Sequence, residues 1–118
     1  MTPEEFARKV LDAVRELGAF EDAEAVAAFL TAEGIKGERL EPCQCPVARF
    51  VAKRIDPDGG NSLFVSVGAD NVTAFDWRSG CDDEGGPALK AWVGFPSATQ
   101  EFIRMFDNYE AFPELVDA

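Results

Sequence analysis

The sequence predicts an α+β fold with three N-terminal helices, a small antiparallel sheet of two or three strands, and a C-terminal helix. Apolar residues recur at helical spacing up to about residue 55, alternate with period two over residues 63–95, and return to helical spacing after residue 97. Helices and strands are thus segregated along the chain, which is typical of the α+β class. The 118 residues have the size of one domain, and we expect a single domain over residues 1–118.

The first two helices carry signals at both ends. The first is expected to begin after Thr2, a good capping residue, with proline at its first position, and to end at Gly18. The second is expected from about Asp22 to Glu33, with Gly34 ending it in a Schellman arrangement. The predicted inner stripes are Phe6, Val10, Ala13, Val14 and Leu17 in the first helix and Val26, Phe29 and Leu30 in the second.

The third helix is expected to run from about Pro46 to Ile55. Its inner stripe is Val47, Phe50, Val51 and Ile55, and its other face carries Arg49, Lys53 and Arg54. Residues 56–61, Asp-Pro-Asp-Gly-Gly-Asn, then break regular structure. They are not an EF-hand loop, because Gly60, Asn61 and Val67 stand where that loop needs an oxygen ligand, a glycine and a glutamate.

Period-two alternation predicts strands over Leu63–Val67 and Val72–Trp77, which a turn at residues 68–71 joins into a hairpin. An acidic loop is expected over Arg78–Pro87, followed by a third strand over Leu89–Phe95.

The residues Ser97-Ala98-Thr99-Gln100 form a capping-box signature that opens the fourth helix. Its predicted inner stripe is Phe102, Met105, Phe106 and Tyr109, and Phe112, Leu115 and Val116 are expected to hold the C-terminal tail against the fold. One continuous core is expected to contain Phe6, Val10, Val14, Leu17, Phe29, Phe50, Val65, Phe102 and Phe106.

Composition excludes several function classes. The chain contains no histidine, which rules out Ser-His and Cys-His nucleophilic pairs and every zinc site that uses histidine. The net charge of −11 repels phosphate backbones and anionic membrane surfaces, so we expect neither a nucleic acid nor a membrane as the partner. An acidic N-terminus without a long apolar run predicts a cytoplasmic protein.

Cysteine supplies the sharpest local feature, the segment Cys43-Gln44-Cys45-Pro46 at the start of the third helix. Proline at the first helical position places Cys45 at the cap, where free backbone N–H groups can stabilise a thiolate and lower its pKa. The alternative is a small side chain that packs under the helix, and we expect this second role.

A zinc site is a further hypothesis, with thiolates from Cys43, Cys45 and Cys81 and a carboxylate from Asp82 or Asp83. Structural zinc sites use four cysteines or cysteine with histidine, and the usual two-residue spacer between paired cysteines is missing here. We therefore expect no metal and no cofactor.

Charged residues give two weaker candidates for contact with a partner. Arg49, Lys53 and Arg54 form a basic cluster that is too small for DNA recognition in so acidic a chain. Asp83 and Glu84 lie in the glycine-flanked loop, where charges are usually just solvated. An enzyme that uses only carboxylates has no support in the spacing of the acids.

Two segments carry a resemblance. Cys45-Pro46-Val47-Ala48-Arg49-Phe50 resembles a Cys-Pro-x-Ala-x-aromatic segment in small uncharacterised proteins of actinobacteria and their phages. Phe102-x-x-x-Phe106-Asp107, followed by Phe112-Pro113-x-Leu115, resembles the C-terminal signature of the same proteins. The resemblance implies a cytoplasmic actinobacterial or phage origin and no mechanism.

Two functions follow from these observations. The first is a non-enzymatic protein that acts by binding or regulating another protein, through an exposed apolar patch or through the acidic loop. The alternative is a thiol-dependent protein, redox-active or metal-binding, centred on Cys43 and Cys45. The oligomeric state is left open by the sequence.

Overall fold

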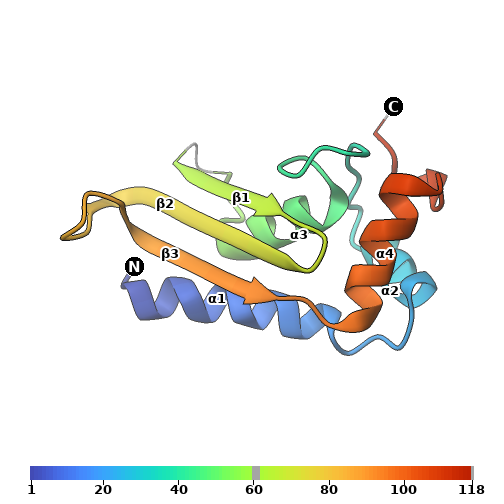
Figure 1. Ribbon diagram of the computed structural model, residues 1–118, viewed down its shortest axis with the longest axis horizontal. Coiled ribbons are helices and arrows are strands. Elements are labelled where there is room, and N and C mark those ends of the chain that lie inside the picture. The colour runs from blue at the N-terminus through green and yellow to red at the C-terminus, as the bar shows by residue number, and fades with distance from the viewer. Residues whose placement is uncertain (60–61, 118) are drawn as a thin grey trace.

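The structure is a computed structural model that describes residues 1–59 and 62–117. In these residues the chain forms three helices, a three-stranded antiparallel sheet and a fourth helix, in that order (Figure 1). The predicted α+β architecture is confirmed. Gly60 and Asn61, part of the predicted break after the third helix, lie outside the described residues.

The first two helices begin and end as their sequence signals predict. α1 spans Pro3–Leu17, and Thr2 and Glu5 cap it reciprocally, because the Thr2 hydroxyl accepts a hydrogen bond from the Glu5 N–H at 3.1 Å. α2 spans Ala23–Ala32. It ends in a Schellman motif, in which Gly34 has a φ of +72° and the Ile35 N–H reaches the Leu30 carbonyl at 3.0 Å.

The sheet has the strand order β1-β2-β3, with β1 at Leu63–Val67, β2 at Asn71–Cys81 and β3 at Pro87–Gly94. Ala74 in the central strand pairs with Val65 on one side and Ala91 on the other. β2 is longer than predicted, so the expected loop at Arg78–Pro87 is partly wrong. Residues 77–81 are exposed on both faces and show no alternation of burial, which is why the extension left no pattern in the sequence.

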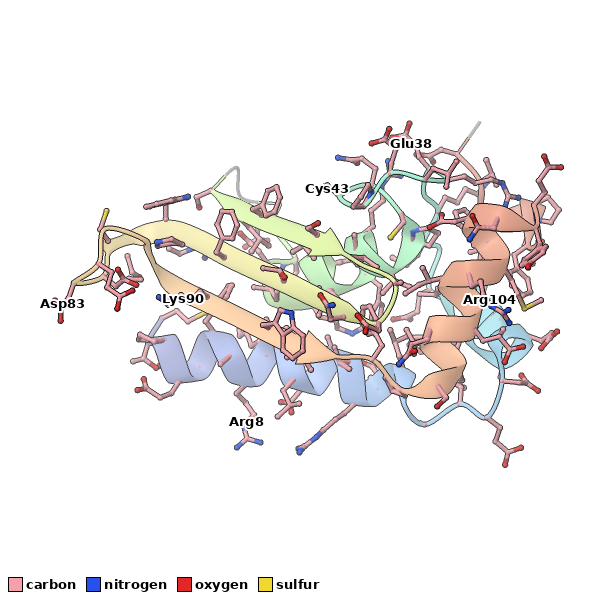
Figure 2. All side chains as sticks on the ribbon, viewed as in Figure 1. Arg8, Glu38, Cys43, Asp83, Lys90 and Arg104 are labelled. Atoms are coloured by element: carbon pink, nitrogen blue, oxygen red, sulfur yellow. The ribbon has the colours of Figure 1, made fainter. Side chains whose placement is uncertain are left out.

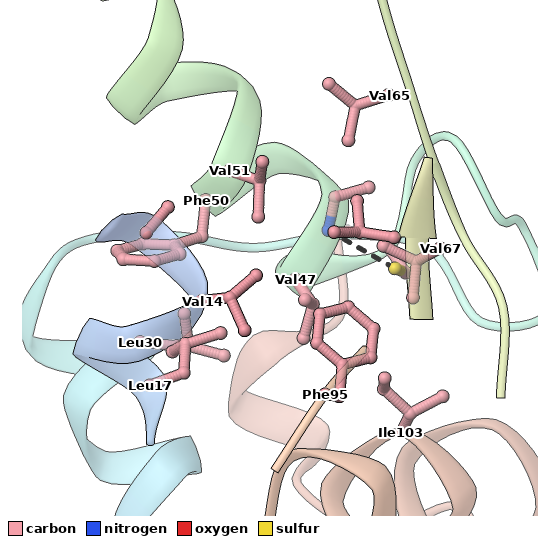
Figure 3. Packing of buried hydrophobic residues seen from close by; sticks show 14 of the residues in the cluster. Val14, Leu17, Leu30, Val47, Phe50, Val51, Val65, Val67, Phe95 and Ile103 are labelled. Carbon is pink, nitrogen blue, oxygen red and sulfur yellow. Dashed lines mark hydrogen bonds between the residues drawn. The ribbon is translucent and has the colours of Figure 1, made fainter. Parts of the chain in front are cut away.

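The helices cover one face of the sheet. α1 and α3, which spans Pro46–Ile55, lie behind the strands in Figure 1, with α1 against β3 and α3 against β1. α4, which spans Ser97–Asn108, packs beside α2 at one end. Residues from all these elements meet in a single hydrophobic cluster, part of which Figure 3 shows. The predicted core is confirmed, although Phe29 is only partly buried.

The start of α4 differs from the prediction. Pro96 occupies the N-cap position and no side chain caps the helix, so the capping box expected at Ser97 does not form. The Gln100 amide instead donates to the Phe95 carbonyl at 2.9 Å, and Thr99 is fully buried. The predicted inner stripe also ends too late, because Tyr109 follows the last helical residue and is 66% exposed. Ile103 is buried in the stripe as well.

The C-terminal tail is held against the fold, as predicted, and it contacts the N-terminal half of the chain. The Phe112 ring stacks on Phe102 with centroids 5.3 Å apart, and Leu115, in the short turn η1 at Pro113–Leu115, is fully buried. Gly37 and Val116 form an isolated parallel bridge, in which the Gly37 N–H donates to the Leu115 carbonyl at 2.8 Å.

Candidate interaction surface

Cys45 is the N-cap of α3 but its thiol is not activated. Its sulfur accepts a hydrogen bond from the Ala48 N–H at 3.4 Å (Figure 3), and its side chain is only 6% exposed. Burial raises the pKa of the Cys45 thiol to about 11 and outweighs the hydrogen bond from Ala48, which acts in the opposite direction. The expectation that Cys45 packs under the helix is confirmed.

The structure does not gather the other predicted metal ligands around Cys45. Cys43 is half-buried in the segment before α3, whereas Cys81 is exposed at the end of β2. In Figure 2, Cys43 lies near α3, and Asp83, two residues beyond Cys81, lies at the distant tip of the β2–β3 hairpin. Across residues 1–59 and 62–117, no group of three Cys, Asp or Glu side chains is placed to hold a metal ion.

Two of the three cations in the predicted basic cluster hold parts of the fold together. The Arg54 guanidinium forms a two-pronged contact with Glu16, at 2.9 and 3.0 Å, also pairs with Glu33, and stacks over the Phe50 ring. Hydrogen bonding to Arg54 lowers the pKa of the Glu16 carboxyl. Arg49 donates to the Lys36 carbonyl at 3.0 Å and pairs with Asp117.

Only Lys53 of this cluster is an exposed side chain that forms no ion pair with the described residues. Arg49 and Arg54 therefore mainly hold α3 to neighbouring segments of the fold. The basic cluster does not offer a cationic surface to a partner.

Asp82 organises the hairpin loop after β2. Its carboxylate accepts hydrogen bonds from the backbone N–H groups of Glu84 at 2.9 Å and Gly86 at 3.0 Å, and it pairs with Lys90 on β3. The hydrogen bond from Lys90, followed by those from the backbone, lowers the pKa of the Asp82 carboxyl. Asp83 and Glu84 remain exposed at the tip of the loop.

A groove of about 500 Å³ lies between the β1–β2 turn and α4. Its walls include Ala69 of the turn and the side chains of Glu101, Arg104 and Asp107 on the helix. Charges of both signs therefore lie along one side of it. None of the site residues predicted from the sequence contributes to this groove.

The outer face of the sheet, opposite α1 and α3, carries several of the large hydrophobic side chains that are exposed in the described residues. Phe64 on β1, Phe75 and Trp77 on β2, and Trp92 on β3 alternate with the buried residues of their strands and therefore point outward. Phe64 is 39%, Trp77 46% and Trp92 68% exposed, and Phe75 is half-buried. We call these four side chains the aromatic face.

Three rings of the aromatic face contact one another on β1 and β2. Phe64 and Phe75 are direct cross-strand partners and stack with centroids 4.5 Å apart. Phe75 meets Trp77 edge-on at 6.4 Å. On β3, Lys90 is the direct partner of Phe75, and Trp92 lies one step further along the outward side, opposite Thr73. Backbone pairing fixes the strand positions of Phe64, Phe75 and Trp92, whereas Trp77 lies in the register shift between Asp76 and Cys81.

Sequence alternation could have located this surface only in part. It put Phe64 and Trp92 on the side opposite Val65 and Val93, but a period of two does not tell which side the helices cover. The informative signal was the outward sequence of β2, where Phe75 and Trp77 stand in place of the polar residues usual on a solvated face.

The chain matches no protein-family model, no curated protein and no solved structure. None of the helices in the described part of the chain has the length and apolar character needed to cross a bilayer.

Proposed function

We propose that this chain is a non-enzymatic cytoplasmic protein that acts by binding another protein through its aromatic face. One observation carries the proposal: four aromatic side chains, one from each edge strand and two from the central strand, lie on the outward side of the sheet, and three of them contact one another. Monomeric proteins rarely expose large apolar patches, and those that occur commonly mark binding sites. Tryptophan and phenylalanine are enriched at protein interfaces.

The energetics favour these rings as binding anchors. Aromatic side chains bury a large apolar area, and a ring on a strand loses little conformational freedom when it is covered. Truncation of an anchor residue at the centre of an interface costs about 2 kcal/mol or more, which is a loss of more than tenfold in affinity. Trp92 is the best candidate for such an anchor, because it is the most exposed of the four rings.

The thiol-dependent alternative has less support. Its central residue, Cys45, is buried, and burial raises the pKa of its thiol, so very little thiolate forms near neutral pH. Cys43 and Cys81 lie on different elements, Cys43 before α3 and Cys81 at the end of β2.

The test is site-specific photo-crosslinking in cells of an actinobacterium, the origin that the two sequence signatures predict. A benzophenone amino acid replaces Trp92 in one variant and Arg8, an exposed residue of α1 that points away from the sheet (Figure 2), in the control. We expect a discrete crosslinked product from position 92 and none of the same mass from position 8. The same product from both positions, or from neither, contradicts the proposal.

A quantitative test follows once that product identifies the partner. Trp92→Ser and Phe64→Ser are each expected to weaken binding of the purified partner by about tenfold or more, while Lys53→Ser leaves it unchanged. Neither aromatic residue belongs to the buried core, so both variants should keep the wild-type circular dichroism spectrum. Unchanged affinity in both aromatic variants would show that the partner binds elsewhere.

A further inference from the structure

The charges around the aromatic face indicate which charge a partner's contact surface should carry. We infer that the partner is a basic protein, whose contact surface has an apolar centre and a rim of lysine and arginine. The inference rests on the proposed function, since it names the occupant of the same face.

The half of the chain that builds the sheet has almost no free positive charge. Residues 61–118 contain 10 acids and 3 bases. Two of these bases form ion pairs within the fold, since Arg78 pairs with Asp76 and Asp56 and Lys90 pairs with Asp82, whereas Arg104 is exposed on α4 beside the Tyr109 ring. Lys90 is the cation that stands on the outer face itself, and Asp82 neutralises it.

Carboxylates that form no ion pair within the described chain lie at both ends of the face. Asp83 and Glu84 are exposed at the tip of the β2–β3 hairpin, beyond Trp77 along β2. Asp70 is exposed in the β1–β2 turn at the opposite end, and Glu101 of α4 is exposed on the groove beside that turn. Figure 2 shows Asp83 at one extremity of the sheet. A surface that covers the rings therefore meets two carboxylates at the hairpin end, and Asp70 and Glu101 at the turn end, where Arg104 is the one cation beside them among the described residues.

This distribution disfavours the other occupants of such a face. A second copy of the chain brings a further net charge of −11 against the first, and its own rim is also acidic. Single strands of nucleic acid stack on aromatic side chains, but they require a positively charged groove along their backbone. A protein with lysine and arginine at its rim gains affinity and association rate from the same carboxylates.

The inference can be tested before the partner is identified. Phage-displayed random peptides are selected in parallel against the full wild-type chain and against the Phe64→Ser/Trp92→Ser double variant. Peptides that bind only the wild-type chain are face-dependent, and we expect them to combine apolar residues with a clear excess of lysine and arginine over aspartate and glutamate. We expect the binding of such a synthetic peptide to weaken by about tenfold or more between low and physiological salt.

A matched pair of charge reversals checks the position of the acids. Asp83→Lys lies at the rim of the face, whereas Asp12→Lys makes the same change of charge on the exposed side of α1. The rim variant is expected to bind the basic peptide several-fold more weakly than the α1 variant. Equal losses in the two variants would mean that only net charge matters, and would overturn the assignment of the rim.

The possible results distinguish the basic partner from the proposal that the aromatic face binds a protein. Face-dependent peptides that are neutral or acidic, or whose binding is insensitive to salt, overturn the basic partner and leave the aromatic face as a binding site. The absence of any face-dependent peptide contradicts both. A dimer that sedimentation equilibrium detects for the wild-type chain and not for the double variant, or single-stranded oligothymidylate binding with the same dependence, identifies a different occupant and overturns the inference.

Discussion

The Asp76 carboxylate lies fully buried on the inward side of β2 and is held by Arg78, two residues further along the strand. The Arg78 backbone N–H donates to one carboxylate oxygen at 2.8 Å, and its guanidinium donates to the other at 2.6 Å. The guanidinium also reaches Asp56, the residue after α3, at 2.8 Å. Arg78 therefore joins the end of a helix to the central strand through two carboxylates.

This ion pair predicts a defined pH dependence of stability. Burial alone would raise the pKa of the Asp76 carboxyl, but the hydrogen bonds from the Arg78 side chain and backbone and from Ser62 hold it below its usual value. Its stabilising contribution is therefore complete above about pH 4, the unfolded pKa, and is lost as pH falls through the lower folded pKa. Asp76→Asn should lower the free energy of unfolding by about 2 kcal/mol at pH 7, and the difference from wild type should shrink below about pH 4.

Urea unfolding over a series of pH values measures this difference. Lys90→Gln, which breaks the exposed pair with Asp82, is the control and should leave the unfolding free energy at pH 7 unchanged. A gap between Asp76→Asn and wild type that stays constant from pH 7 to pH 3 would mean that Asp76 does not titrate as described.

Thr99 presents an uncompensated polar group in the core. Its hydroxyl is fully buried and has no hydrogen-bond partner among the described residues. Thr99→Val keeps the shape and removes the hydroxyl, so we expect it to raise the free energy of unfolding by about 1 kcal/mol. Chemical denaturation measures the change.

The matched control for Thr99 is Thr31→Val, which removes a hydroxyl that donates to the Ala27 carbonyl at 2.8 Å. This variant should be neutral or slightly destabilised. If Thr99→Val is less stable than wild type, its hydroxyl has a partner in solution and the prediction is wrong.

Thiol reactivity should rank by burial. In single-cysteine variants at pH 8, Cys81, which is exposed, should react with iodoacetamide much faster than Cys45, whose thiol has its pKa raised to about 11. Mass spectrometry of timed samples gives both rates, and in denaturant the two should converge. Fast alkylation of Cys45 in the folded protein would restore the thiol-dependent hypothesis.

The fold should not depend on a bound metal. Replacement of Cys43, Cys45 and Cys81 together by alanine should leave the far-ultraviolet circular dichroism spectrum unchanged, because Cys45 is one small member of a large apolar cluster and the other two lie outside it. Elemental analysis of protein purified from its native host is the independent measurement. About one equivalent of tightly held zinc, or unfolding on addition of a chelator, would contradict this expectation and favour the metal site.

Local signals predicted the elements, and they were less reliable for the two ends of α4. Thr2, Gly34 and Pro46 each act within a turn of their own helix, so their roles could be read from neighbouring residues. The exposed position of Tyr109 depends on where α4 ends, and the burial of Thr99 depends on Pro96 taking the cap position.

The sequence predicted which side chains share a face of the sheet, but it did not predict which of the two faces the helices cover. The alternation in the strands gave the two sets of side chains, but the coverage of one face comes from α1 and α3, which are distant in sequence from β3. The fate of Arg49 and Arg54 likewise depended on remote acids, Asp117 for one and Glu16 and Glu33 for the other. Two arginines that form a basic cluster in the sequence therefore form ion pairs within the fold.

The bridge between Gly37 and Val116 has a consequence for the order in which the protein acquires its structure during synthesis. Leu115 is fully buried, and η1 contacts α2, so a segment translated after all three strands completes the packing of a helix made early. While η1 is still inside the ribosome, the part of α2 that packs against η1 remains exposed. The helix therefore reaches its final packing only after η1 has left the exit tunnel, and a truncation before Leu115 should leave α2 open to proteases.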